Sequence, residues 1–166
     1  ILHSVKVIAM VGASSNVVRP SYLVMQYLLS KGYDVIPVNP GLAGQELQGK
    51  MVYGTLKDIP QAIDMVDIFR SSDAAGAIVD EALNLTPLPS VIWMQLSVRD
   101  DAAAMRAEAA GVKVVMNRCP KMEYGKQSGE WAWVGGNSGI LSSRRQNMHE
   151  SGKMQSLGLG VIPTKR

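Results

Sequence analysis

Short apolar runs alternate with amphipathic stretches along the first 119 residues, and this alternation constrains the fold more than any other feature. VKVIAMV (5–11) and VIWMQL (91–96) are almost continuously apolar, which is typical of strands buried on both faces. Residues 20–31 instead carry apolar side chains at helical spacing and end before Gly32. Such strands, separated by helices, predict βαβ units and a parallel sheet with helices on both faces.

The fold class predicted from this pattern is α/β, with a Rossmann-like, doubly wound, mainly parallel sheet. The expected strands are residues 5–11, 34–38, 51–53, 65–69, 91–96 and 112–116, and the expected helices are residues 20–31, 73–85 and 100–110.

The pattern decays near residue 120, so we expect two parts. Residues 1–120 form the Rossmann-like domain, and residues 121–166 form an irregular extension packed on this domain or on a partner subunit. EWAWV (130–134) alternates and suggests an edge strand or arm. Seven of the 17 basic side chains but three of the 14 acidic ones follow residue 119. Because the basic residues are scattered, we expect a solvated tail and no nucleic-acid partner.

Several classes of protein are excluded by composition. A single cysteine, Cys119, cannot form an internal disulfide. The two histidines, His3 and His149, lie far apart in sequence, so we expect no metal site. No apolar stretch approaches the roughly 18 residues that a membrane span needs. We therefore expect a cytoplasmic protein with no membrane partner.

The turn after the first strand has the composition of a phosphate cradle. Its residues are Gly12, Ala13, Ser14 and Ser15, and Arg19 precedes the expected helix. Glycine permits a tight turn, serine offers amides and hydroxyls, and a helix amino end with an arginine favours an anion. The alternative interpretation is an ordinary strand–helix turn with a serine cap.

The sequence lacks the determinants of the common nucleotide-binding motifs. Ser14 stands where G-x-G-x-x-G requires its second glycine, and no third glycine follows. The second strand ends in Val38, Asn39 and Pro40, without the acidic residue that binds an NAD ribose. A Walker A motif is also absent.

Short segments that each contain polar side chains follow three further strands, at the edge where an open α/β sheet binds ligands. These residues are Phe69, Arg70 and Ser71 after the fourth strand, Gln95, Leu96 and Ser97 after the fifth, and Asn117, Arg118 and Cys119 after the sixth. An arginine at such an end often only caps carbonyls. Three of them on one edge, Arg19, Arg70 and Arg118, favour an anionic ligand.

Four ordered motifs resemble a known family. VGASSNVVRPSYLVMQYLLSKGYDVIPVNPG, DMVDIFRSSD, VIWMQLSV and VVMNRCPKMEYGK are similar to bacterial CoA-binding domain proteins, stand-alone relatives of the CoA-binding domain of the succinyl-CoA synthetase α subunit. The resemblance covers about residues 5–145, including Trp133, Gly135, Asn137 and Ser138 of a family-like W-x-G-x-N-S tail. It implies a Rossmann-like fold that binds coenzyme A at the carboxyl ends of the strands.

The resemblance also implies roles for individual residues. Gly12, Ala13 and Ser14 would hold CoA phosphates with help from Arg19, and Asn39 and Pro40 would lie against the adenosine. Phe69, Arg70 and Ser71 would border the nucleotide, and Gln95 and Leu96 would contact the pantetheine arm. Asn117, Arg118 and Cys119 lie in a segment similar to the synthetase's N-C-P turn.

Two departures from the synthetase limit what the resemblance implies. Leu42 stands where the synthetase has a phosphate-binding lysine, and neither histidine matches its phosphohistidine. Ligase catalysis is therefore not expected. Cys119 is interpreted as a buried small hydrophobe, with a reactive thiol or a mixed disulfide with CoA as the alternative.

Three functions remain open at this stage. The first is binding of CoA or acyl-CoA by a non-catalytic domain. The second is an NAD(P)-dependent oxidoreductase or nucleotide-binding redox regulator. The third is a subunit of an acyl-CoA-handling complex, acting as a homodimer or with a partner subunit.

Overall fold

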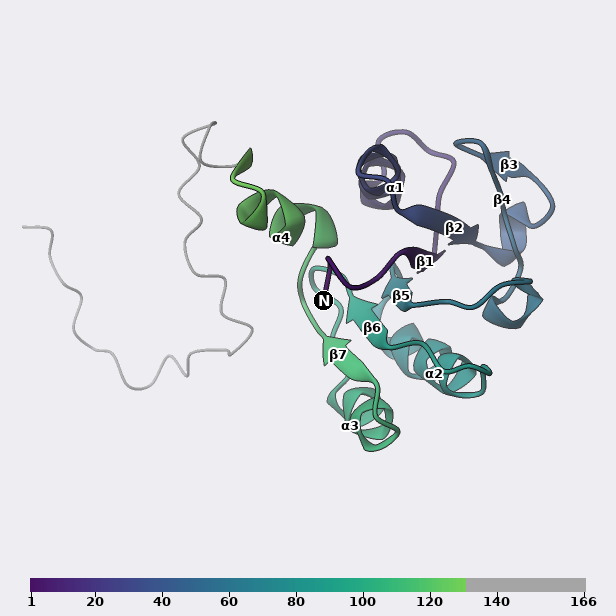
Figure 1. Cartoon of the computed structure of the whole chain (residues 1–166). Helices are drawn as coiled ribbons and strands as arrows, with labels where there is room; N and C mark the ends of the chain where they lie inside the picture. Colours follow the sequence, from purple (N-terminus) through teal and green to yellow (C-terminus); the bar gives the residue numbers. More distant parts are fainter. Residues whose placement is uncertain (131–166) are drawn as a thin grey trace, which may run out of the picture.

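A five-stranded parallel sheet forms the centre of the molecule (Figure 1). The computed structural model describes residues 1–130. The strand order is β2-β1-β5-β6-β7, so the chain starts inside the sheet and extends it first to one side and then to the other. The strands are β1 (Val7–Val11), β2 (Asp34–Val38), β5 (Met65–Ile68), β6 (Val91–Met94) and β7 (Lys113–Val115).

Helices cover both faces of this sheet. In Figure 1 α1 and α4 lie on one side of the strands, and α2 and α3 lie on the other. The helices are α1 (Pro20–Ser30), α2 (Ser72–Leu83), α3 (Asp101–Ala109) and α4 (Pro120–Gln127). This arrangement confirms the predicted Rossmann-like, doubly wound sheet.

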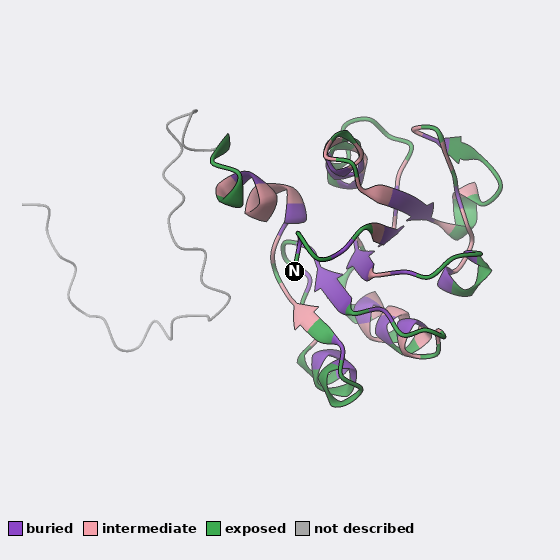
Figure 2. Ribbon diagram, in the orientation of Figure 1, coloured by how far each residue is buried: buried purple, intermediate pink, exposed green. Residues whose placement is uncertain are grey.

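The two faces of the sheet bury separate apolar clusters. Ile8 and Met10 of β1 pack with α1, whereas Ala9 between them packs on the side of α2 and α3. Alternate side chains point to opposite sides of a strand, so the helices on both sides of the sheet bury both faces of the central strands. Figure 2 shows the buried residues in the strands and on the inner faces of the helices. This double burial explains why the strand sequences are continuously apolar.

The strand expected at residues 51–53 is replaced by a small hairpin outside the main sheet. Its strands are β3 (Glu46–Leu47) and β4 (Lys50–Met51), which pair antiparallel. Only one parallel bridge, between Val38 and Tyr53, connects this region to β2. β2 is the edge strand of the main sheet, which also explains how it accommodates Pro37.

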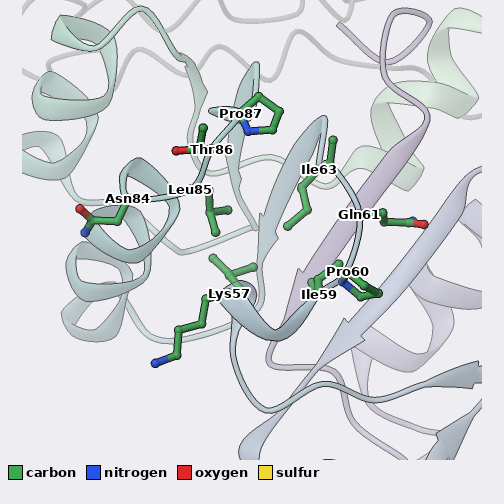
Figure 3. Close-up of a pocket in the computed structure, with 11 residues that line it drawn as sticks. Lys57, Ile59, Pro60, Gln61, Ile63, Asn84, Leu85, Thr86 and Pro87 are labelled. Carbon is green, nitrogen blue, oxygen red and sulfur yellow. The ribbon is translucent and has the colours of Figure 1, made fainter.

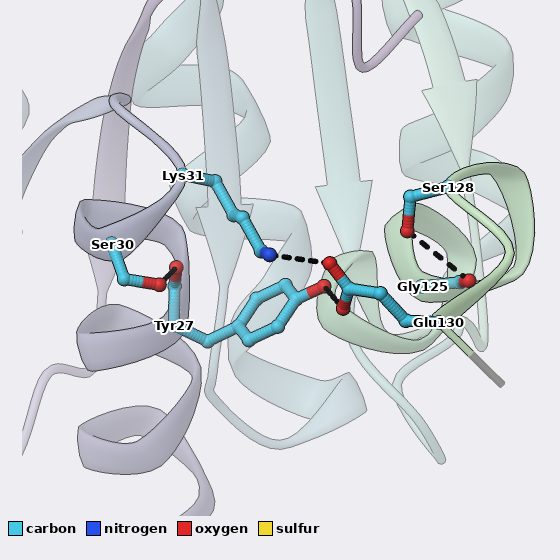
Figure 4. A network of polar contacts seen from close by, with 6 residues as sticks. All are labelled: Tyr27, Ser30, Lys31, Gly125, Ser128 and Glu130. Carbon is cyan, nitrogen blue, oxygen red and sulfur yellow. Dashed lines mark hydrogen bonds and ion pairs between the residues drawn. The ribbon is translucent and has the colours of Figure 1, made fainter. Parts of the chain in front are cut away.

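Helix α4 is the described part of the predicted C-terminal extension. The Tyr27 hydroxyl donates a hydrogen bond of 2.7 Å to Glu130 Oε2, and Lys31 forms an ion pair with the same carboxylate (Figure 4). The Tyr124 ring meets those of Tyr27 and Tyr33 edge-on. These contacts fasten α4 to α1. The strand expected at residues 130–134 and the W-x-G-x-N-S tail lie outside the described residues, apart from Glu130.

Among the helices of residues 1–130, none is both long and apolar enough to cross a bilayer.

The backbone at Gly12 leaves no room for a side chain. Its φ is +91°, a region that L-residues rarely adopt. A Cβ there would lie 2.9 Å from the Phe69 carbonyl carbon and closer still to the carbonyl oxygen. Gly12 therefore lets the end of β1 approach the end of β5.

We expect Gly12→Ala to destabilise the protein by about 3 kcal/mol or more, because strain at positive φ adds to the backbone clash. Gly32→Ala is the matched control, since Gly32 has a φ of +87° but nothing within 4 Å of its Cβ position. It should cost only about 1–2 kcal/mol. Urea unfolding measures both changes in the free energy of unfolding. Equal losses of stability would show that the contact with the Phe69 carbonyl adds no cost at Gly12.

Candidate functional site

A cleft opens at the carboxyl ends of β1, β5 and β6, at the point where the strand order reverses. The chain leaves β1 towards one face of the sheet and leaves β5 towards the other, which separates the two loops. The cleft has a volume of about 480 Å³. It is lined by Gly12, Ala13, Ser14, Arg19, Pro20, Ser21, Val24, Asn39, Phe69, Arg70, Gln95, Leu96, Val98 and Cys119.

The loop between β1 and α1 is held in place by hydrogen bonds. The Gly12 amide donates to the Val38 carbonyl at 2.9 Å, and Asn39 Nδ2 donates to the Ala13 carbonyl at 2.7 Å. Within the loop, the Asn16 amide donates to Ser14 Oγ at 3.1 Å. Asn39 therefore holds the turn of Gly12, Ala13 and Ser14 in place and also lines the cleft.

The electrostatic character of the cleft is positive. Arg19 and Arg70 both line it, and neither forms an ion pair with another residue in the described part of the chain. Arg19 is also the N-cap residue of α1, where its side chain makes no capping hydrogen bond. The lining contains no acidic side chain. Two unpaired guanidinium groups beside a helix amino end suit a multiply charged anion.

The loops after β6 and β7 are joined to each other under backbone strain. Ser97 and Asn117 both have positive φ, +68° and +55°. The Ser97 amide donates to Asn117 Oδ1 at 2.8 Å, and the Asn117 amide donates to the Val98 carbonyl at 3.2 Å. Strained residues of this kind cluster at functional sites. Here they set the position of the loop that carries Gln95 and Leu96.

Ten of the fifteen predicted cofactor-binding residues line the cleft: Gly12, Ala13, Ser14, Arg19, Asn39, Phe69, Arg70, Gln95, Leu96 and Cys119. The other five do not.

Each of these five has a defined place nearby. Ser15 is exposed on the loop between β1 and α1, Pro40 begins a short 3-10 turn, and Ser71 precedes α2. Asn117 connects the two loops, and Arg118 Nη1 pairs with Glu123 Oε1 at 3.1 Å. Their role in ligand binding stays a prediction, and Arg118 already has an anionic partner.

Four of the lining residues, and Asp67, which contacts Gln95, were not predicted from the sequence. Pro20, Ser21, Val24 and Val98 belong to the first turns of α1 and the loop before α3. Asp67 was also missed, although a carboxylate inside the apolar run MVDIF is a recognisable signal.

Asp67 is buried in β5, and its side chain has one hydrogen-bond partner within residues 1–130. Gln95 Nε2 donates to Asp67 Oδ1 at 2.8 Å, whereas Oδ2 has no partner. Burial raises the pKa of this carboxyl to about 7, and the hydrogen bond from Gln95 partly opposes that increase.

Cys119 lines the cleft and has the character of a buried thiol. It is 8% exposed and is the N-cap residue of α4. Burial raises its pKa, although the backbone amides of Met122 and Lys121 act in the opposite direction. These properties favour the interpretation of Cys119 as a packing residue.

A second cavity, of about 490 Å³, lies at the opposite edge of the sheet (Figure 3). Residues 59–63 before β5 and residues 84–87 before β6 form most of its wall. It is therefore near the amino ends of the strands. Lys57 is its single charged lining residue, so it lacks the paired arginines of the first cleft.

The fold and the cleft define a Rossmann-like domain with a positively charged cleft at the switch point. The chain matches the model of the CoA binding domain family over residues 6–125. It is 34% identical over 124 residues to the uncharacterized protein YneT of Bacillus subtilis, which covers 75% of this chain and 89% of YneT. The chain belongs to the CoA binding domain family.

Two solved structures share this fold. A hypothetical protein from Pyrococcus horikoshii is 37% identical, with a TM-score of 0.71 over 76% of this chain and 86% of that chain. A dinucleotide forming acetyl-coenzyme A synthetase from Ca. Korarchaeum cryptofilum is 24% identical, with a TM-score of 0.58 over 66% of this chain and 25% of that chain. The second likeness shows the fold alone.

The raised pKa of Asp67 predicts a specific pH dependence of stability. Between about pH 4 and 7 the unfolded chain has lost this proton while the folded protein retains it, so burial of Asp67 destabilises the fold increasingly as pH rises. Asp67→Asn removes this contribution. The unfolding free energy of the variant relative to the wild type should therefore increase by up to about 4 kcal/mol across that range. Denaturant unfolding at several pH values measures it, and parallel curves for the two proteins would contradict the prediction.

Proposed function

We propose that this protein binds coenzyme A, or an acyl-CoA, in the cleft at the carboxyl ends of β1, β5 and β6. The observation that carries the proposal is a pair of arginines, Arg19 and Arg70, that have no ion-pair partner among residues 1–130 and lie beside the glycine turn of a CoA binding domain fold. Coenzyme A carries a diphosphate and a 3′-phosphate, which match this concentration of positive charge.

The shape of the cleft supports one orientation of the ligand. The turn of Gly12, Ala13 and Ser14 and the amino end of α1 would hold phosphate through backbone amides and the helix dipole. The pantetheine arm would then extend along Gln95 and Leu96 towards Cys119.

Binding without catalysis is the form of the proposal that we favour. The two titratable groups nearest the pantetheine end, Cys119 and Asp67, are both buried and both have raised pKa values. Among residues 1–130, neither forms a hydrogen bond with a histidine that would make a nucleophile–base pair. Action as a homodimer or as a subunit of an acyl-CoA-handling complex is compatible with the same cleft.

The first test compares CoA with NAD. A ligand at about 100 times its dissociation constant adds roughly 2.7 kcal/mol of stability, which raises the melting temperature by several degrees. We expect this increase with CoA and none with NAD at equal concentration, because Asn39 replaces the ribose-binding acid. Equal increases, measured by differential scanning fluorimetry, would favour a generic nucleotide pocket or the NAD(P)-dependent alternative.

The second test removes one of the two unpaired arginines. Arg19→Ala should weaken CoA binding about 10- to 150-fold, since a charge-assisted hydrogen bond contributes roughly 1.5–3 kcal/mol. The melting temperature without ligand should change little, because this side chain is exposed. Arg106→Ala is the matched control, because it removes an exposed arginine of α3 that pairs with Asp80 and does not line the cleft.

Titration calorimetry with dephospho-CoA identifies which phosphate group of CoA Arg19 contacts. This ligand keeps the diphosphate but lacks the 3′-phosphate. If Arg19 contacts the diphosphate, the variant loses affinity for both ligands equally, whereas a loss with CoA alone places Arg19 at the 3′-phosphate. Unchanged affinity for both would mean that the loop is only a turn.

A further inference from the structure

Asp67 occupies a place where a carboxyl group is costly. Its sheet neighbours are Met10 of β1 and Trp93 of β6, and Asp67 itself is fully buried. Met65 packs with the cluster under α1, so strand alternation places Asp67 on that same face of the sheet. An acid in such apolar surroundings needs a reason beyond packing.

Its hydrogen bond fixes the orientation of one amide group. Gln95 Nε2 donates to Asp67 Oδ1 at 2.8 Å, so the nitrogen of the Gln95 side chain points into the core. This contact forms with an ionised carboxylate, and also with a neutral carboxyl whose proton is on Oδ2. In both states Oδ1 acts as an acceptor.

The other amide atom of Gln95 is left for the cleft. Gln95 Oε1 has no hydrogen-bond partner among residues 1–130. If this oxygen were also fully buried, it would be a second buried polar atom without a partner, but in this range Asp67 Oδ2 is the only one. Gln95 Oε1 is therefore not fully enclosed. Gln95 lines the cleft, so Oε1 is the amide atom of this side chain that remains free to accept a hydrogen bond there.

We propose that Asp67 is a positioning residue, which turns the Gln95 amide so that its oxygen accepts a hydrogen bond from a ligand N–H group. The inference rests on the proposed function, because the pantetheine arm of CoA contains two secondary amides that can donate such a bond. Asp67 does not line the cleft and acts through Gln95. Through Gln95, Asp67 thus makes the site favour a ligand that donates a hydrogen bond at this position.

The test measures two ligands by titration calorimetry. CoA contains the pantetheine arm, whereas adenosine 3′,5′-bisphosphate retains the nucleotide and its phosphates and lacks the arm. Asp67→Leu removes the acceptor, so the Gln95 nitrogen is released towards the ligand and CoA should bind about tenfold more weakly. Asp67→Asn offers Gln95 both an acceptor and a donor, so a smaller loss, about threefold, is expected. Neither variant should change the affinity for adenosine 3′,5′-bisphosphate.

A double-mutant cycle separates positioning from a general structural effect. In a Gln95→Leu background, Asp67→Asn and Asp67→Leu should cause no further loss of CoA affinity, because the amide through which Asp67 acts is absent. Additive losses would overturn the inference, as would equal losses for CoA and adenosine 3′,5′-bisphosphate. Failure of the wild type to bind CoA would instead refute the proposed function.

A measurement on the wild type covers the case in which Asp67→Leu does not fold. In the ¹⁵N–¹H spectrum, one of the two side-chain amide protons of Gln95 should exchange slowly with solvent, because it is donated to a buried carboxyl. Fast exchange of both protons would overturn the inference.

Discussion

The close approach of the ends of β1 and β5 is the constraint on which the site depends. β1 pairs with β2 on one side and β5 on the other, and the chain leaves β1 and β5 towards opposite faces. The loops diverge and open a cleft, but only if the strand ends themselves come close together. Gly12 permits this, because its positive φ and its missing Cβ leave room for the Phe69 carbonyl. The same turn leads to Arg19 and the amino end of α1, whereas Arg70 lies on the loop that follows β5.

Charge around the cleft is unevenly paired within the described part of the chain. Arg19 and Arg70 lie in the cleft without ion-pair partners in the described part of the chain, whereas Arg118 is neutralised by Glu123. Asp67 is buried with one oxygen unpartnered, which lowers the stability of the folded protein above about pH 4. A buried carboxyl that lowers stability is the kind of feature that often marks a functional site.

The second cavity shows why volume alone does not identify a site. Its volume is close to that of the first cleft, but it lies at the amino ends of the strands. Its lining in the described part of the chain includes neither a glycine nor an arginine. The carboxyl edge of the sheet gathers these groups because every strand in a parallel sheet ends there, and the helices α1, α2, α3 and α4 begin there.

The sequence by itself determined the layers of the fold, because burial on both faces of a parallel sheet requires strands that are apolar throughout. Family membership also followed from the order of the motifs, and the glycine turn with Arg19 followed from composition. The sequence could not show that Arg118 pairs with Glu123, or that Asn117 holds the loop of Ser97, since both contacts join segments whose approach depends on packing. It also left Asp67 as an irregularity in an apolar strand. Only the tertiary structure placed Gln95, directly after β6, against it, because the register of β5 and β6 decides which side chains meet across a sheet.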